Sequence, residues 1–274
     1  MRLFRILRSP SASIGLAVLL VLVLACMFSS HLVYYSPFEQ NMDVKLLGPS
    51  AAHWMGTDQF GRDVLVRILV GTKYSLTAGF VSVLLSLAGG LALGVPAGYL
   101  GGALDKGLML VCDIMLAFPG ILLAMALSMV IGPGIYTPMV TVGISSIPVF
   151  ARLVRVQFLS LREAPFVEAM RAAGAGDLRI AFKHILPNAM GPILVQSTLR
   201  MGIAIVTAAT LSFLGLGAQP PTPEWGAMVF SGKEYISTAW WVITFPGLAI
   251  LLSVLGFNLL GDGLRDVLDP RMKE

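Results

Sequence analysis

The sequence predicts an all-α membrane protein with six transmembrane helices and a long cytoplasmic loop between the fourth and the fifth. Of its 274 residues, 56% are hydrophobic and only 12% are charged, whereas a soluble domain is about 25% charged. Apolar stretches of about 20 residues, long enough to cross a bilayer, recur along the chain. Lys and Arg also gather on alternate segments. This composition excludes a soluble globular protein, a disordered tail and a coiled coil.

Six stretches have the length and apolar character that a spanning helix needs. The first expected span covers residues 14–33, and the others cover 75–100, 107–131, 135–150, 189–216 and 240–260. Arginines precede the first span, as in a signal peptide. Its apolar stretch, however, is longer than a signal core of about 7–15 residues, and no Ala-x-Ala site follows. We therefore interpret it as a retained helix.

The distribution of positive charge predicts that both ends of the chain lie on the inner side. With the N-terminus inside, 13 of the 19 Lys and Arg residues fall on inner segments and five on outer ones, while Arg200 lies within a span. The excess of positive charge marks the cytoplasmic side. The expected organisation is an inner N-terminus (1–13), the first span (14–33), an outer segment (34–74), a core (75–260) that contains the inner loop 151–188, and an inner C-terminus (261–274).

The sequence carries no recognisable catalytic or cofactor site. The nearest approach to a phosphate-binding loop is Ser231-Gly232-Lys233-Glu234, which has Ala227 in place of the upstream Gly and lacks a hydroxyl residue after the Lys. The three histidines are scattered without zinc-site spacing, so we expect no metal. A net charge of +4 is too small to favour a nucleic-acid binder. These observations favour a transport pathway that is driven by an ion gradient or by a partner protein.

The inner loop predicts a short helix–turn–helix. Residues 166–173 contain good helix formers, and Gly174 breaks that helix and permits a tight turn. Asp177 is placed to cap a second helix over 178–185, and Pro187 ends it or begins the next span. From the residues alone, the pair either rests on anionic lipid headgroups or forms a docking surface for a partner.

This loop resembles the EAA loop of ATP-binding-cassette importer permeases. The family pattern is Glu-Ala-Ala, three residues, Gly, nine residues, Ile, one residue, Leu-Pro. Here Met170 replaces the second Ala and His184 stands where Ile is usual. In that family the loop forms a coupling helix that sits in a groove of the cytosolic ATPase. The resemblance assigns this role to Glu168, Ala169, Met170, Arg171, Gly174, Asp177, His184, Leu186 and Pro187.

Four further stretches resemble the dipeptide/oligopeptide/nickel branch of this family, and in particular the second of its two permease subunits. One lies in the outer segment and comprises Gly56, Thr57, Asp58, Gly61, Arg62 and Asp63. The others are Leu-Ser-Phe-Leu-Gly-Leu-Gly at 211–217, Glu-Trp-Gly at 224–226, and Asn-Leu-Leu-Gly-Asp-Gly-Leu-Arg-Asp at 258–266 with Asp269-Pro270 after it.

The resemblance implies a multi-pass permease of the bacterial inner membrane, with both termini cytoplasmic and residues 34–74 periplasmic. It implies three kinds of partner besides membrane lipid: a second homologous permease, two cytosolic ATP-binding subunits and a periplasmic substrate-binding protein. ATP and Mg would be bound by the ATPases, and this chain would carry no cofactor and no catalytic residue. We expect di- or oligopeptides as cargo, with nickel, glutathione or an opine as alternatives. A gradient-driven carrier, which should show inverted repeats and mid-membrane ionisable residues, is the alternative outside the family.

Several residues have two interpretations. Arg200 and Asp113 either line the translocation path or form structural ion pairs, such as one with each other. The 56–63 cluster either braces the outer segment by ion pairs or contacts the binding protein. Arg171, Arg179 and Lys183 either pair with ATPase carboxylates or face anionic lipid. The charged residues just after the last span form contacts with the ATPase or the second permease, or else local helix pairs; they are Asp262, Arg265, Asp266 and Asp269. Finally, Gly90, Gly94 and Gly98 are spaced four apart and predict close helix packing.

Overall fold

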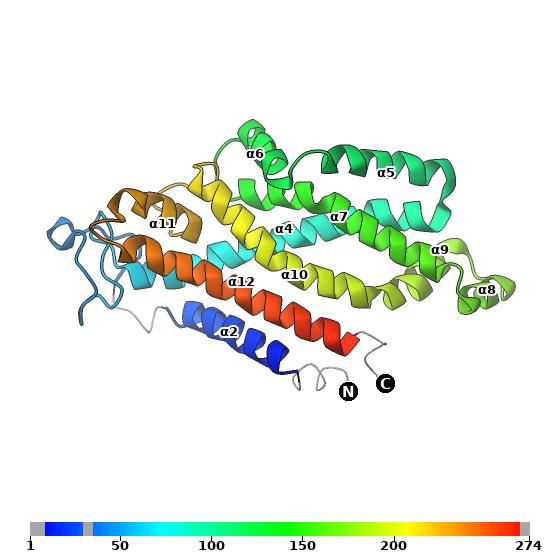
Figure 1. The fold of residues 1–274 in the computed structure, drawn as a ribbon, viewed down its shortest axis with the longest axis horizontal. Coiled ribbons are helices and arrows are strands. Elements are labelled where there is room, and N and C mark those ends of the chain that lie inside the picture. The colour runs from blue at the N-terminus through cyan, green and yellow to red at the C-terminus, as the bar shows by residue number, and fades with distance from the viewer. Residues whose placement is uncertain (1–8, 30–34, 269–274) are drawn as a thin grey trace.

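A computed structural model describes residues 9–29 and 35–268, which form an elongated bundle of helices (Figure 1). The three N-terminal arginines, the last residues of the expected first span, and Asp269-Pro270 lie outside the described residues. The helices are α2 (Pro10–Met27), η1 (Met42–Val44), α4 (Val64–Leu100), α5 (Gly102–Leu116), α6 (Gly120–Ile131), α7 (Thr137–Leu161), α8 (Pro165–Ala172), α9 (Asp177–Arg179), η2 (Ile180–Ile185), α10 (Leu186–Phe213), α11 (Trp225–Gly232), η3 (Lys233–Tyr235) and α12 (Trp241–Leu268).

The expected all-α membrane fold is confirmed. Five helical stretches, α2, α4, α7, α9 to α10, and α12, are long and apolar enough to cross a membrane. The pair α5 and α6 passes the same test when it is taken together, which brings the number of spans to as many as six. The helices therefore agree with the six spans that the hydropathy pattern predicts.

The third span is not the single helix that the sequence suggests over 107–131. Its two halves, α5 and α6, meet at an angle of 88°. The break lies at Phe118-Pro119, where α6 begins directly after Pro119. Proline disfavours helical backbone in the residue before it and lacks an N–H to donate. Hydropathy values do not include this effect of proline on the backbone, so the apolar stretch 107–131 looks like one continuous helix.

Three other helices extend past the expected membrane boundaries. α4 begins at Val64, inside the expected outer segment, because the Asp63 carboxylate accepts a hydrogen bond from Val66 N (2.9 Å) and caps the helix. α7 runs to Leu161, so the first residues of the expected inner loop continue the span. α12 continues to Leu268. Hydropathy finds the apolar part of a helix, whereas the backbone continues until a cap or a proline ends it.

α4 and α7 run parallel and pack closely along the glycines of α4. A Cβ atom at Gly94 would lie 2.5 Å from the Ala151 carbonyl oxygen, and one at Gly98 would lie 2.6 Å from Phe158 Cβ. Gly90 faces Phe150 in the same way. The expected small-residue stripe is therefore confirmed. Without a hydrophobic driving force between helices in lipid, such close backbone approach supplies much of the attraction.

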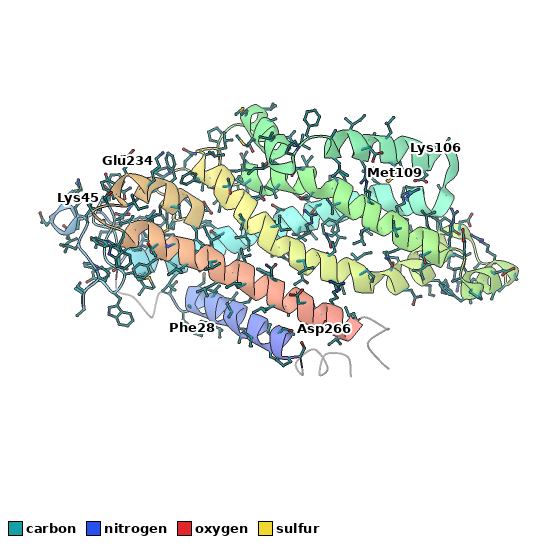
Figure 2. All side chains as sticks on the ribbon, in the orientation of Figure 1. Phe28, Lys45, Lys106, Met109, Glu234 and Asp266 are labelled. Atoms are coloured by element: carbon teal, nitrogen blue, oxygen red, sulfur yellow. The ribbon has the colours of Figure 1, made fainter. Side chains whose placement is uncertain are left out.

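α12 runs antiparallel to both α2 and α10. Gly263 faces Ala12 while Gly256 faces Gly15, and Gly261 faces Leu199. The beginning of α2, the end of α12 and the beginning of α10 therefore lie at the same end of the bundle as the loop that contains α8. We call this the α8 end and the opposite one the α11 end. Figure 2 shows Lys45 and Glu234 near the α11 end and Lys106 near the α8 end.

We predict opposite effects for the same substitution at two helical glycines. Gly94→Ala should lower the stability of the purified chain in detergent by about 1–3 kcal/mol, because the new methyl group overpacks the contact with α7. Gly107→Ala, on α5, has no neighbouring atom within 4 Å of the new Cβ and should leave stability unchanged or raise it by about 1 kcal/mol through helix propensity. Thermal unfolding followed by tryptophan fluorescence measures both. Equal melting temperatures for the two variants would contradict this account of the α4–α7 contact.

Candidate functional site

The helix α8 is held against the ends of α4 and α7 by one apolar face. Val167 is fully buried, in a cluster that includes Val95 from α4 and both Val154 and Phe158 from α7. Phe166 and Met170 are partly buried and pack against this cluster. α8 begins at Pro165, whose fixed φ suits the first position of a helix. The expected helix over 166–173 is thus present and anchored to the bundle.

The opposite face of α8 and the turn that follows it are open. Glu168, Ala169 and Arg171 are exposed. Leu178 and Phe182, just beyond the turn, are 77% and 54% exposed. The result is a protruding surface with apolar side chains between charged ones, which we call the α8–α9 tip. It comprises Glu168, Ala169, Arg171, Ala172, Ala173, Gly174, Asp177, Leu178, Arg179, Phe182 and Lys183.

Gly174 makes the turn between α8 and α9. Its φ is +80°, a region that L-residues rarely adopt and glycine adopts freely. Ala175 N donates to Met170 O (3.0 Å), and Gly174 N donates to Arg171 O (2.9 Å). These two bonds form a Schellman motif, which satisfies the last carbonyls of α8. The helix break expected at Gly174 therefore has a defined geometry.

Asp177 does not cap the second helix, contrary to the sequence-based expectation. α9 starts at Asp177 itself, after Gly176, and its first turn receives no side-chain cap. The Asp177 carboxylate instead accepts a hydrogen bond from the hydroxyl of Tyr99 (2.6 Å), near the end of α4. Asp177 binds Tyr99 and not the backbone of its own helix because the turn at Gly174 brings α9 back to α4. This adds a second tether between the tip and the bundle.

The rest of the expected second helix is a π-helical turn, η2, that leads without a break into α10. Ile180 and Ile185 are fully buried in the cluster that holds Val167. His184 is half-buried, and its carbonyl oxygen accepts a hydrogen bond from Asn188 Nδ2 (2.7 Å). Leu186 packs against the cluster, while Pro187 lies in the first turn of α10. The motif thus joins the tip to α10, which crosses the bundle.

The outer cluster is a buried ion-pair network at the α11 end. Arg62 Nε donates to Asp58 Oδ2 (2.7 Å), and Arg67 Nε lies 3.5 Å from the same oxygen. Asp63 Oδ2 lies 2.8 Å from His53 Nδ1. All five side chains are buried. His53 and Arg67 were missed from sequence, because neither belongs to the 56–63 motif and only the fold brings them to it.

The remaining members of this motif hold the outer segment together. Leu47 N donates to the hydroxyl of Thr57 (2.9 Å), and Trp241 Nε1 donates to Thr57 O (3.0 Å). Gly56 and Gly61 have φ values of +73° and +70°. A side chain at Gly61 would collide with the backbone of Asn41. Each position of the motif therefore serves the packing of this segment against α12 and itself.

Asp113 and Arg200 do not pair with each other. Asp113 Oδ1 accepts from Arg152 Nη2 of α7 (2.5 Å), and both side chains are about half exposed. A second pair, Asp105 with Arg155 (Nη2 to Oδ2, 2.6 Å), links the same two helices closer to the α8 end. Arg200 lies in the middle of α10, and its Nε is buried without a hydrogen-bond partner among the described residues. The two residues thus have different environments.

The other family-like stretches serve caps and close packing. Glu224 caps α11 by accepting from Gly226 N (3.0 Å) and Ala227 N (2.9 Å). Trp225 is fully buried and donates from Nε1 to Ile68 O (3.0 Å). In 211–217, Gly215 has a φ of +81° and ends α10 with the same pair of bonds as Gly174. In 258–266 the glycines lie against α2 and α10, as described above.

Family models match most of the chain. Residues 90–274 match the binding-protein-dependent transport system inner membrane component. Residues 2–49 match the N-terminal TM domain of oligopeptide transport permease C.

Curated relatives cover nearly the whole chain. The dipeptide transport system permease protein DppC of Alkalihalophilus pseudofirmus is 47% identical over 97% of this chain and 88% of its own length. The glutathione transport system permease protein GsiD of Pectobacterium atrosepticum is 50% identical, over 94% and 86%. A solved chain of the MetNI methionine ABC transporter, in inward-facing conformations, has a TM-score of 0.58 and 23% identity over 74% of this chain and 96% of its own. That likeness shows the fold.

We predict that neutralising Asp58 destabilises the chain severely. Asp58→Asn leaves the buried guanidinium groups of Arg62 and Arg67 without their shared negative charge, which should cost about 3–5 kcal/mol. Asp43→Asn changes an exposed carboxylate in the same segment and should stay within about 0.5 kcal/mol of the unmodified chain. Urea titration in detergent, followed by tryptophan fluorescence, measures the difference. If both variants unfold at the same urea concentration, the cluster does not brace the outer segment.

Proposed function

The chain belongs to the family of binding-protein-dependent transport system inner membrane components, and we propose that it carries di- or oligopeptides across the membrane under the drive of partner ATPases. It is a multi-pass permease subunit of an ATP-binding-cassette importer and has a transport role. The peptide cargo is proposed because relatives with 44% to 47% identity over most of this chain are named as dipeptide permeases.

The observation that carries this proposal is the α8–α9 tip. A helix that lies on lipid buries its apolar face in the headgroups, but the main apolar face of α8 is already buried against α4 and α7 through Val167. What remains exposed is a protruding surface with Leu178 and Phe182 among charged residues. Such a mixture suits a groove on a soluble partner better than it suits a bilayer. We propose that this groove belongs to a cytosolic ATPase.

The anchoring of the tip explains how a partner's movement would reach the membrane helices. α8 contacts the ends of α4 and α7 through the Val167 cluster, Asp177 is hydrogen-bonded to Tyr99 of α4, and η2 continues into α10. A displacement of the tip therefore moves three spans together. In the proposed cycle, ATP binds one arrangement of the ATPases better than the other. This differential affinity shifts the permease between inward-open and outward-open states.

The proposed assembly contains two permeases, two ATPases and a periplasmic binding protein. ATP and Mg would be held by the ATPases, and this chain would hold no cofactor. Both termini and the tip would be cytoplasmic, in agreement with the antiparallel packing of α12 on α2 and α10. The burial of the 56–63 cluster favours its role as a brace within the periplasmic segment. Contact with the binding protein would then fall on exposed residues of that segment such as Trp54.

A second candidate cargo is glutathione, itself a tripeptide. Relatives named as glutathione transport permeases are 50% and 47% identical to this chain over 94% and 98% of its length. The two cargo classes share peptide bonds and a terminal carboxylate, so the same path serves either. Competition between labelled dipeptide and unlabelled glutathione during uptake distinguishes them.

We predict that Gly174→Ala uncouples the permease while Gly176→Ala does not. Both glycines are exposed, and a Cβ atom at either meets no atom within 4 Å. Only Gly174 has a positive φ, so only there does a side chain strain the backbone, by about 1–2 kcal/mol. The Gly174 variant should therefore retain less ATPase on co-purification from native membranes in gentle detergent, or stimulate it less, than the Gly176 variant does.

The proposal is wrong if the unmodified chain purifies from native membranes without any ATPase. Dipeptide uptake that persists when ATP is depleted, and stops when the proton gradient is collapsed, would then indicate a gradient-driven carrier. Equal coupling in the two glycine variants would contradict only the role of the Gly174 turn.

A further inference from the structure

One face of α10 is left open along the middle and outer parts of the helix. No residue from 194 to 200 is buried, and between 201 and 214 the positions that are not buried are 203, 206, 207, 210, 213 and 214. The positions 196, 200, 203, 207, 210 and 214 therefore form a row with a spacing of three or four residues. This period places them on one side of the helix. The other side packs against α4, α7 and α12. Figure 1 shows α10 crossing the bundle between α7 and α12.

The open face of α10 is chemically unlike the open faces of two other spans, α2 and α12. On α2 the exposed large side chains are apolar, as at Val21 and Leu24, and on α12 Leu251 and Leu255 are of the same kind. Such faces suit lipid. The face of α10 instead carries Gln196, Arg200, Thr207 and Thr210 among its apolar residues. Lipid contact would therefore be more costly on this face than on the open faces of α2 and α12.

Arg200 contributes most to the cost of exposing this face to lipid. It stands near the middle of α10, about 20 Å of helix from Leu186. A charged side chain at mid-membrane depth is unfavourable unless it meets water or a partner. Its Nε is buried without a partner among residues 9–29 and 35–268. The carboxylate of Asp113 is already bound to Arg152. The Arg200 side chain is only partly buried, so the rest of its guanidinium group can meet water or an acceptor from outside the described residues.

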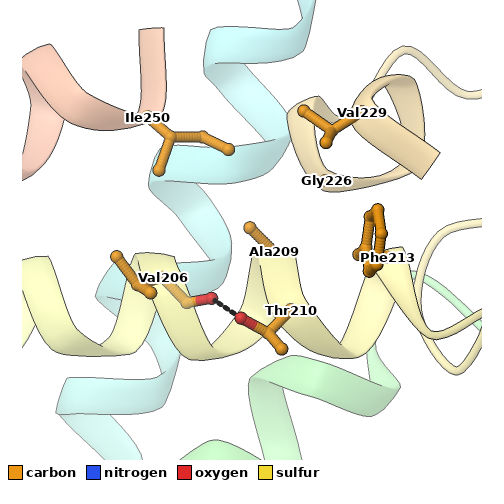
Figure 3. A pocket seen from close by; sticks show the side chains of 7 residues that line it. All are labelled: Val206, Ala209, Thr210, Phe213, Gly226, Val229 and Ile250. Carbon is orange, nitrogen blue, oxygen red and sulfur yellow. Dashed lines mark hydrogen bonds between the residues drawn. The ribbon is translucent and has the colours of Figure 1, made fainter. Parts of the chain in front are cut away.

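Beside the α11 end of this face lies an apolar pocket of about 190 Å³, which shares Thr210 with the face. Its lining comes from α10, α11 and α12 and includes Val206, Thr210, Phe213 and Ile250. Figure 3 shows the Thr210 hydroxyl donating to the carbonyl of Val206 (2.8 Å). The hydroxyl of Thr207 donates to Ile203 O in the same way (2.8 Å). Each donor is thus satisfied within the helix, and each hydroxyl oxygen can still accept a bond from a passing N–H group.

We propose that the open face of α10 lines a water-filled translocation path and that Arg200 binds the carboxylate of the cargo as it passes. This inference rests on the proposed peptide cargo. Hydroxyl and amide groups spaced along the face match the neutral peptide groups of such a cargo, and the single fixed cation matches its terminal carboxylate. A carboxylate of the second permease is the alternative partner for Arg200, and the second test below distinguishes the two.

The first test measures water access and charge along this face, independently of what is transported. In native membranes, and in a chain with Cys26→Ser and Cys112→Ser, single cysteines are introduced at Thr207, at Ile203 and, as the lipid-facing control, at Leu251. We expect a water-soluble thiol reagent to modify Thr207→Cys at least about tenfold faster than Leu251→Cys, because only thiolate in water reacts. At Ile203→Cys, one turn from Arg200, a negatively charged reagent should react faster than a positively charged one. Arg200→Gln should abolish that preference.

The second test measures uptake of a labelled dipeptide by cells that produce only the variant chain. Loss of a hydrogen bond to a charged group corresponds to about tenfold to a hundredfold in binding. We therefore expect Arg200→Gln to lower uptake by about tenfold at limiting dipeptide and Arg200→Lys to restore part of it. Co-purification of the second permease, assayed in parallel, should be unchanged in both variants.

Three results would overturn the inference. The face is not a path if Thr207→Cys reacts as slowly as Leu251→Cys. Arg200 is a structural partner of the second permease if Arg200→Gln releases that subunit. It does not bind cargo if uptake is unchanged in that variant. If the unmodified chain fails to take up dipeptide while the thiol results hold, the proposed cargo is wrong and the path assignment is supported.

Discussion

Three glycines one turn apart let the backbones of α4 and α7 approach until side chains of one touch the backbone of the other. Because lipid supplies no hydrophobic force between helices, this close fit and the hydrogen bonds beside it hold the pair together. The two helices then end side by side at the α8 end and present Val95, Val154 and Phe158 as one apolar surface. Val167 packs against that surface, and this contact holds the whole α8–α9 tip to the bundle.

Polar groups within the bundle follow a simple division. Several near the two ends are paired, as in the Asp58–Arg62 network, the Asp105–Arg155 bridge and the Tyr99–Asp177 hydrogen bond. Serine and threonine hydroxyls within the spans donate to carbonyls a turn earlier, as Ser82 does to Ala78, which removes the cost of an unsatisfied donor in lipid. Arg200 departs from this pattern. Polar residues at membrane depth usually mark function, and the departure is what directs attention to α10.

The sequence was sufficient for features that depend on composition and local backbone preference. The number of spans, the glycine stripe, the helix at 166–173 and the turn at Gly174 all follow from hydropathy or from what glycine alone tolerates. Features that depend on distant partners were not accessible. Asp177 looked like a cap because caps are local, yet Tyr99 lies 78 positions away. His53 and Arg67 carried no signal until folding placed them beside Asp63 and Asp58. The break at Pro119 could have been found, because proline disfavours helix in the preceding residue.

Because α2 packs against α12, the bundle cannot be completed until the last long helix has been synthesised. Gly15 meets Gly256, so the first and last long helices of the described chain share a contact that no intermediate stage of synthesis can make. At about 5–20 residues per second, roughly 10 to 50 s separate the emergence of the two glycines from the ribosome. During that interval the small-residue face of α2 that later receives α12 must be covered by lipid or by the insertion machinery. Completion of the bundle is therefore bound to the end of translation, and a chain that stops short of α12 leaves that face uncovered for quality control to recognise.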